Sequence, residues 1–189
     1  FHNGLDIVTN KPQKIISNLD LISPYDYNIF DKNVLKRPYN GEVINAIDYE
    51  ISRGCIYSCS YCVETIIQKY YGFNEINEKT GSIKNIKQYR RNKSALIIFN
   101  EIKKLNKNLN ISLFRMQDTN FLTIDRKVLE ELSELIGESN LKIKLYIETR
   151  AEGINEKSVS LLKKLKVDGV GMGLELADEK YRNDYLNRF

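Results

Sequence analysis

The pattern of apolar and polar positions changes along the chain at about residue 44. Residues 1–43 combine Pro, Asn, Asp and Tyr without a sustained period, as in "SNLDLISPYDYNIFDKN", which predicts an ordered arm or linker. The segment "VINAIDYEIS" then alternates and is rich in Ile and Val, which predicts a strand that leads into Gly54 and Cys55. We therefore expect an N-terminal arm over residues 1–43 and a regular domain over residues 44–189.

Helical patterns follow the predicted strand. A short helix is expected after the cysteines as far as Tyr70, and then a polar loop, "NEINEKTGSIKN", with Gly81. "SALIIFNEIKKL" and "TIDRKVLEELSELIG" carry apolar residues at helical spacing and predict two helices, the second with Asp125 as its N-cap and Gly137 as its stop. The apolar faces predicted for these helices are Leu96, Phe99, Ile102 and Leu105, and Val128, Leu129, Leu132, Leu135 and Ile136.

Strand patterns lie between and after these helices. "NISLFRMQ" predicts one strand, and "LKIKLYIETR" predicts another because apolar and polar positions alternate in it. "NEKSVSLLKKLK" predicts a helix capped by Asn155, "GVGMGLE" a strand and "ADEKYRNDYLNR" a final helix. Four strands, each followed by a helical segment, predict an α/β fold of parallel βα units that curl toward a (β/α) barrel or form an open wound sheet.

Polar residues stand at the carboxyl ends of the predicted strands. Ligands of parallel βα folds bind beyond these ends, so a site is expected there, although a single polar strand end is commonly just solvated. The four ends carry Ser52, Arg53 and Gly54; Gln117 and Asp118; Glu148, Thr149 and Arg150; and Glu175.

The last predicted strand has two unlike faces. If its apolar face meets the helices, the glycine face opens a space under Glu175. The alternative is that the glycines fit a crowded barrel interior. The glycine face holds Gly171, Gly173 and Glu175, and the apolar face Val170, Met172 and Leu174.

Composition and charge exclude several classes of protein. The 189 residues carry 29 Lys and Arg against 25 Asp and Glu, a net charge of +4, and the cations are spread along the chain, so we expect no nucleic-acid partner. No apolar run approaches the ~20 residues of a membrane span and no signal peptide is visible, so we expect no membrane partner. The odd number of closely spaced cysteines does not suit a disulfide framework, which favours a reducing, cytoplasmic setting.

The cysteines all lie in "RGCIYSCSYC", as Cys55, Cys59 and Cys62. Because a chain spans at most ~3.6 Å per residue, their sulfurs can converge on one centre. Thiolates suit zinc, copper(I) or an iron–sulfur cluster, but structural zinc takes four ligands and the only histidine, His2, is far away in the sequence. Three sulfurs leave one coordination position open, which favours catalysis; the alternative is a chance group of inert buried cysteines.

Other common catalytic groups are excluded by the near absence of histidine. A single His does not support Ser-His-Asp, Cys-His or histidine–zinc chemistry. The cysteine spacing, in contrast, resembles that of a known family. "CIYSCSYC" fits the C-x3-C-x-aromatic-C motif of radical S-adenosylmethionine (SAM) enzymes.

This resemblance implies a set of cofactors and partners. Cys55, Cys59 and Cys62 would hold a [4Fe–4S] cluster whose remaining iron binds SAM. Reductive cleavage of SAM then gives methionine and a 5′-deoxyadenosyl radical, which abstracts hydrogen from the substrate. The implied partners are a small-molecule or otherwise unknown substrate and a reductant such as flavodoxin or ferredoxin.

The rest of the chain, from about residue 15 to 188, resembles more loosely the cobalamin-binding subgroup of that family. The resemblance implies that Tyr61 is the motif aromatic, whose backbone would lie by the SAM adenine, and that Glu175 would contact the SAM ribose. Arg150 would be a candidate partner of the SAM carboxylate. Asp118 matches an acidic position with a role toward SAM or substrate. The alternatives are a surface ion pair for Arg150 and helix capping for Asp118.

The chain also departs from the family pattern. The family barrel has six strands, whereas four are predicted here, so we expect a partial barrel from a longer protein. The arm would join the barrel to a cobalamin-binding domain outside this chain, and the exposed sheet edge of the isolated fragment would favour dimerisation.

Three functions therefore stay open. The first is a radical SAM enzyme, with cobalamin-dependent methyl transfer as one reaction that the resemblance allows. The second is a methylthiotransferase-like enzyme that modifies tRNA. The third is a non-catalytic metal-binding or electron-transfer module.

Overall fold

A five-stranded sheet forms the centre of the computed structural model, which describes residues 4, 10, 12–79 and 82–188. The strand order is β1-β2-β7-β8-β9. β1 pairs with β2 in the antiparallel direction, while β2, β7, β8 and β9 run parallel, which confirms the four predicted parallel strands. The strands are β1 Lys36–Tyr39, β2 Glu42–Tyr49, β7 Leu113–Met116, β8 Lys144–Thr149 and β9 Val167–Met172.

The sheet curls, so that side chains at the end of β1 reach β9 at the amino end of the parallel strands. A Cβ placed on Gly169 of β9 would lie 2.9 Å from the Tyr39 hydroxyl oxygen of β1. The Asn40 amide donates to the Asp168 carboxylate across 3.4 Å, beside the same contact. Because β1 and β9 stand at opposite ends of the strand order, these contacts require strong curvature, and the fold is a partial (β/α) barrel.

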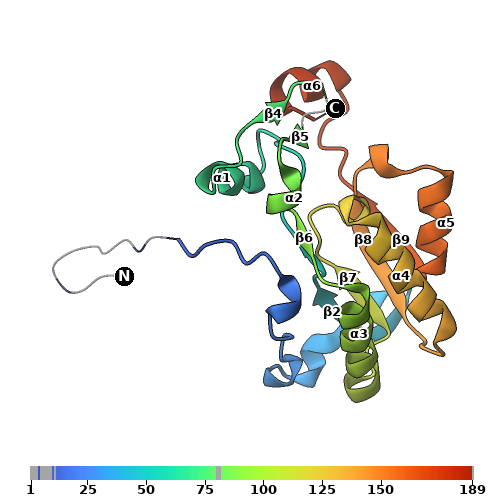
Figure 1. Ribbon diagram of the computed structural model, residues 1–189. Coiled ribbons are helices and arrows are strands. Elements are labelled where there is room, and N and C mark those ends of the chain that lie inside the picture. The colour runs from blue at the N-terminus through green and yellow to red at the C-terminus, as the bar shows by residue number, and fades with distance from the viewer. Residues whose placement is uncertain (1–3, 5–9, 11, 80–81, 189) are drawn as a thin grey trace.

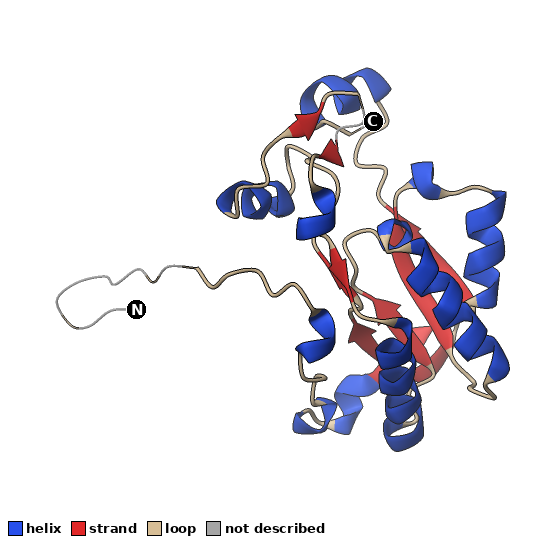
Figure 2. Cartoon of the chain, in the orientation of Figure 1, coloured by secondary structure: helices blue, strands red, loops and turns tan. Residues whose placement is uncertain are grey.

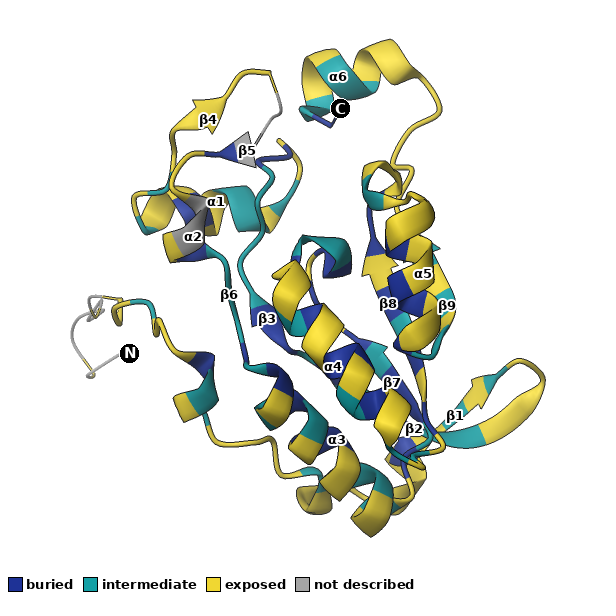
Figure 3. Cartoon of the chain, turned by 45° about the vertical axis from the view of Figure 1, so that its right-hand side comes forward, coloured by how far each residue is buried: buried dark blue, intermediate teal, exposed yellow. Residues whose placement is uncertain are grey.

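Three helices, α3 Ala95–Leu109, α4 Arg126–Glu138 and α5 Glu156–Lys164, lie side by side along one face of the sheet (Figures 1 and 2). Their apolar stripes pack on the strands, and this interface is the buried layer of the molecule (Figure 3). Leu145 and Ile147 of β8 are fully buried there. Burial of one such side chain contributes roughly 1.5–3 kcal/mol, so the interface holds most of the apolar stabilisation.

The buried face of α3 differs from the predicted one. Leu96 is 59% exposed, while Ala95, Ile98 and Ile102 are buried. The predicted residues were three positions apart, and at 3.6 residues per turn each such step rotates by about 60° around the helix, so the row cannot stay on one face. Of the predicted row, Ile102 is buried as expected, while Phe99 and Leu105 pack only partly against the core.

The helix caps were mostly predicted correctly. The Asp125 carboxylate accepts from the Lys127 backbone N–H, and the Asn155 side chain forms a capping box with Ser158. The predicted stop at Gly137 is wrong, because α4 continues through Gly137 to Glu138.

β9 is shorter than predicted and ends at Met172, so Glu175 lies in the following loop. A Cβ on Gly169 or on Gly171 would lie 2.6 Å from the Tyr146 side chain, which supports the crowded-interior alternative at these two positions. On the other face Met172 is 52% exposed. Within the described residues β9 pairs with β8 alone, and the end of its apolar face stays open.

Short elements crowd the carboxyl ends of the parallel strands (Figure 1). The segment predicted as a polar loop contains the β4–β5 hairpin, and Gly81 lies outside the described residues. The short elements are β3 Ser52–Arg53, α1 Val63–Tyr70, β4 Ile76–Asn77, β5 Ser82–Ile83, α2 Ile86–Tyr89, β6 Arg91–Asn92 and α6 Glu179–Leu186, with 3-10 turns at Phe121–Thr123 and Ala151–Gly153.

The described part of the arm contains three 3-10 turns, and it packs on the barrel. The Asp20 carboxylate accepts from the Ser94 backbone N–H at 2.8 Å, at the start of α3, and the Tyr27 hydroxyl donates to the Asp48 carbonyl at 2.6 Å. The sheet already begins at Lys36, inside the segment predicted as arm. His2 lies outside the described residues. The turns are Leu19–Leu21, Tyr27–Ile29 and Lys32–Leu35.

Candidate functional site at the carboxyl ends of the strands

The cysteine loop begins after β3 with a turn that requires glycine. Gly54 has φ +88°, and a Cβ there would lie 2.6 Å from the Tyr89 carbonyl oxygen. From α1, the buried Gln68 amide donates to the carbonyls of Cys55 at 3.0 Å and Tyr57 at 2.7 Å, while Glu64 accepts from the Cys55 N–H at 3.1 Å. The side chains of α1 therefore hold the loop by its backbone groups. The cysteine side chains take no part in these hydrogen bonds.

The three cysteines are free thiols with different exposure. Cys59 is buried, whereas Cys55 and Cys62 are partly exposed. Burial raises the pKa of Cys55 to about 11, against the lowering effect of the Tyr57 N–H, which donates to its sulfur at 3.4 Å. Negative charge on Glu64, Cys59 and Cys62 raises the pKa of Cys55 further.

The side chains of the loop do not meet around one point. Across the ranges that the structure describes, no three Cys, His, Asp or Glu side chains lie close enough to hold a metal ion. The chemistry of the donor set nevertheless fits an iron–sulfur cluster, because three thiols outside any disulfide share one short loop. Their convergence on one centre therefore stays a prediction.

A cavity of about 370 Å³ lies beyond the ends of β7, β8 and β9. Two cations, Arg150 and Arg188, and two carboxylates, Glu148 and Glu175, line it together with backbone-rich glycine segments. A wider hollow of about 620 Å³ lies at the opposite ends of the strands, away from the cysteine loop. The remaining lining residues of the smaller cavity are Thr119, Thr149, Gly171, Met172 and Gly173.

Arg150 follows β8 and reaches the cysteine loop. Its side chain is 7% exposed, its Nη2 lies 2.6 Å from Glu152 Oε1, and its Nη1 donates to Cys59 Sγ at 3.6 Å. The guanidinium carbon lies 3.8 Å from the centre of the Tyr57 ring. The ion pair of the alternative is present, with Glu152 as the partner, but its arginine is buried against the loop and does not lie at the surface.

Tyr61 and Glu175 come together through Arg188, a residue that no sequence pattern singled out. Arg188 Nη1 donates to the Tyr61 hydroxyl at 3.4 Å, its Nη2 lies 4.0 Å from Glu175 Oε1, and it also donates to the Gly173 carbonyl. Glu175 has φ +64°, a left-handed conformation that turns its carboxylate back toward the cavity lining. Burial raises the pKa of Tyr61 to about 12, so it stays a neutral hydroxyl.

Asp118 is buried and does not line the cavity. It is 2% exposed, and its Oδ1 accepts from the N–H groups of Ile51 at 3.2 Å and Ser52 at 2.6 Å and from the Ser52 hydroxyl at 2.5 Å. Helix capping is therefore wrong for Asp118, which instead ties the end of β7 to the strand that enters the cysteine loop. Burial raises the pKa of this carboxyl to about 6.

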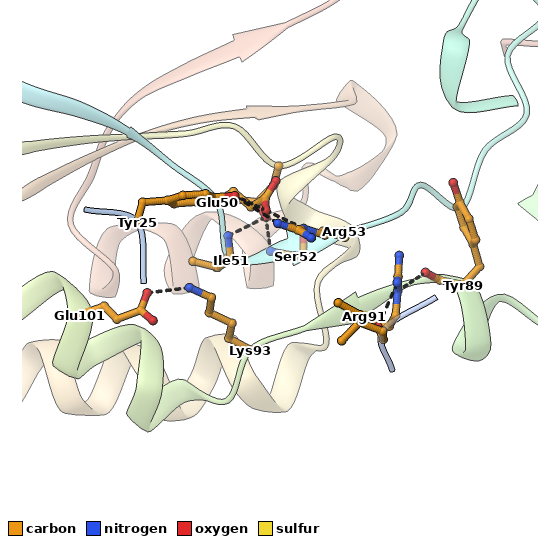
Figure 4. A network of polar contacts seen from close by, with 11 residues as sticks. Tyr25, Glu50, Ile51, Ser52, Arg53, Tyr89, Arg91, Lys93 and Glu101 are labelled. Atoms are coloured by element: carbon orange, nitrogen blue, oxygen red, sulfur yellow. Dashed lines mark hydrogen bonds and ion pairs between the residues drawn. The ribbon is translucent and has the colours of Figure 1, made fainter. Parts of the chain in front are cut away.

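The arm also contacts the strand that enters the cysteine loop (Figure 4). The Arg53 guanidinium donates to Glu50 Oε1 at 2.7 Å and to the Tyr25 hydroxyl at 3.1 Å, and the Tyr25 hydroxyl donates to Glu50 at 3.1 Å. Arg53, one of the polar residues predicted at the end of the first strand, is thus part of the contact between arm and barrel.

The C-terminal segment closes over the cysteine loop. Ser60 donates through its N–H to the Leu186 carbonyl at 3.1 Å and through its hydroxyl to the Tyr185 carbonyl at 2.6 Å. The Asn187 amide donates to the Ser58 carbonyl at 3.0 Å. The loop is therefore fixed by groups far away in sequence.

A family model described as the Radical SAM superfamily matches residues 49–188. The chain belongs to the radical SAM superfamily. A [4Fe–4S] cluster and SAM are the cofactors of this superfamily, as the cysteine spacing implied. No helix of the described residues has the length and apolar character of a membrane span. No curated protein matches the chain.

Two solved structures have a similar fold. The radical SAM methyltransferase TsrM from Kitasatospora setae, with cobalamin and a [4Fe–4S] cluster bound, matches at a TM-score of 0.53 and 18% identity over 71% of this chain and 22% of that one. The cobalamin-dependent SAM radical enzyme OxsB, with aqua-cobalamin and SAM bound, matches at 0.50 and 19% over 74% and 20%. This radical SAM chain thus spans about a fifth of their length.

Proposed function

We propose that this radical SAM chain binds a [4Fe–4S] cluster through Cys55, Cys59 and Cys62 and SAM in the adjoining cavity of about 370 Å³. The observation that carries the proposal is the position of the three-thiol loop beside that charged cavity, at the carboxyl ends of the parallel strands. When bound, the two cofactors supply the reductive SAM cleavage that produces a 5′-deoxyadenosyl radical.

The residues of the chain bind and orient SAM in this proposal. The carboxylate of Glu175 accepts hydrogen bonds from the ribose hydroxyls, and the backbone beside Tyr61 lies along the adenine. Arg150 supplies positive charge toward the SAM carboxylate. Asp118 does not contact SAM in this proposal. Its carboxylate accepts hydrogen bonds from the N–H groups of Ile51 and Ser52, which fixes the strand that enters the cysteine loop.

We further propose a cobalamin-dependent reaction, such as methyl transfer to a small-molecule substrate. The resemblance of the sequence to the cobalamin-binding subgroup supports this, as does the fold shared with TsrM and OxsB. Cobalamin would be bound by a domain outside this chain, joined through the arm, and a reductant such as flavodoxin or ferredoxin would supply the electron.

The test is anaerobic reconstitution of the chain with iron and sulfide, followed by electron paramagnetic resonance with and without SAM. We expect close to four irons per chain and a reduced-cluster signal that changes when SAM is added. Cys59→Ala should lose the cluster, because two thiolates hold it poorly. Ser139→Ala, at the end of α4 and away from the cysteine loop, keeps all three thiols and serves as the control.

A colourless, zinc-loaded protein, or a cluster signal that does not respond to SAM, would contradict the proposal. Zinc loading would instead support the non-catalytic metal-binding module. A cluster of normal content in Cys59→Ala would show that the ligands were assigned wrongly.

A further inference from the structure

We infer that Arg150 sets the reduction potential of the cluster through its contact with Cys59. The inference rests on the proposed function, since it takes Cys59 as a cluster ligand. Arg150 is thereby a positioning residue for the electron-transfer step, in addition to any contact that it makes with SAM.

The contact joins distant parts of the chain. Arg150 stands at the end of β8, and Cys59 lies 91 positions earlier, in the loop after β3. The distance between Nη1 and Sγ is 3.6 Å, and both side chains are buried. An N–H group at this distance donates to sulfur in a region that water reaches poorly, where electrostatic effects are strong.

Two neighbours fix the direction of the guanidinium. Glu152 Oε1 accepts from Nε at 3.2 Å and from Nη2 at 2.6 Å, which sets the plane of the group. The ring of Tyr57 lies 3.8 Å from the guanidinium carbon. With Nε and Nη2 engaged by Glu152, Nη1 is the nitrogen that the geometry directs to Cys59.

The sign of the effect follows from charge. Reduction adds one electron to the cluster, and a fixed cation that donates to a ligand sulfur stabilises the added negative charge. Arg150 therefore raises the reduction potential and makes the cluster easier to reduce. Glu152 carries the opposite charge and is 46% exposed, so it lowers the potential by a smaller amount.

The experiment is a redox titration of the reconstituted chain, followed by electron paramagnetic resonance. Arg150→Met should lower the reduction equilibrium constant about tenfold at constant cluster content, which equals about 59 mV for one electron. Arg150→Lys should recover part of the shift, because the charge remains while the fork geometry is lost. Glu152→Gln should shift the potential in the opposite direction.

Arg126→Met is the matched control. It also removes one positive charge from an ion pair, but Arg126 lies on α4 with its side chain 56% exposed, paired to Glu130, and the potential should not change. An unchanged potential in Arg150→Met with full cluster content overturns the inference. If that variant loses only SAM affinity, Arg150 acts on the SAM carboxylate alone.

Two outcomes keep the inference separate from the proposed function. A wild-type chain that assembles no cluster contradicts the proposed function itself. If Arg150→Met does not fold, Glu152→Gln decides the matter, since a half-exposed carboxylate can be replaced without opening the core. A Glu152→Gln potential equal to that of the wild type would then count against the inference.

Discussion

Lys93→Met breaks a buried ion pair beneath the strand that enters the cysteine loop (Figure 4). Lys93 Nζ lies 2.6 Å from Glu101 Oε2, and the two side chains are 8% and 9% exposed. The Tyr49 hydroxyl donates to the same carboxylate oxygen, and Lys93 Nζ lies 5.3 Å from the centre of the Tyr49 ring. The substitution would leave the Glu101 carboxylate buried with Tyr49 as its one remaining donor among these groups.

The cost of the change follows from that burial. Removal of one partner of a buried pair costs about 3–5 kcal/mol, because the other charge stays desolvated without compensation. A domain of this kind has about 5–15 kcal/mol of total stability, so the loss is a large share of it. Lys93→Met combined with Glu101→Leu should recover part of the loss, because apolar groups of similar volume replace buried pairs at little cost, while the buried Tyr49 hydroxyl loses its acceptor.

Urea denaturation followed by circular dichroism measures these differences. The matched control is Lys127→Met, whose pair with Glu131 is 84% and 50% exposed, and whose loss should cost less than about 1 kcal/mol. The reasoning is wrong if Lys93→Met destabilises the chain by less than about 1 kcal/mol, or if the double variant is no more stable than the single one.

Further outcomes are expected around the site. Gly54→Ala should reduce the iron bound per chain, because its Cβ would lie 2.6 Å from the Tyr89 carbonyl oxygen. Gly137→Ala is the control, since a Cβ there has no neighbour within 4 Å, and its iron content should not change. Equal iron content in the two variants would contradict this prediction. Because burial raises the folded-state pKa of Asp118 from 3.8 to about 6, the folded state binds this proton more tightly than the unfolded state does. The stability contributed by protonated Asp118 is thus present below pH 3.8 and is lost as the pH rises to about 6. The urea midpoint of Asp118→Asn should lack this part of the pH dependence. If the midpoints of the variant and the wild type change with pH in parallel, the raised pKa of Asp118 is refuted. The open edge of β9 should favour self-association that Met172→Lys weakens, and a monodisperse wild-type monomer by light scattering would argue against it.

Much of the fold was predictable because its signals are local. The β8 alternation and the caps at Asp125 and Asn155 depend on neighbours within a few residues, and the structure confirms them. The errors lie where tertiary packing decides. Leu96 was placed inside and is exposed, because the apolar residues of α3 allow more than one face and the sheet selects one.

In the candidate site, too, local features were predictable and contacts between distant residues were not. The cysteine motif was visible because its spacing is contained in one short loop, and the family match over residues 49–188 agrees with it. Arg188 was missed, since an arginine near the end of a polar helix carries no periodic signal. Asp118 was predicted to have a role toward SAM or substrate, but in the structure it accepts hydrogen bonds from Ser52 and so holds the strand that enters the cysteine loop.

The sequence by itself determined that three thiols share one loop after a parallel strand, because ligand spacing is a property of adjacent residues. Only the tertiary structure decided which charges reach that loop. Arg150 meets Cys59 and Arg188 meets Tyr61 because the sheet curls and the C-terminal segment crosses its open end. Such contacts between distant residues depend on the packing of the whole chain, which no local pattern specifies.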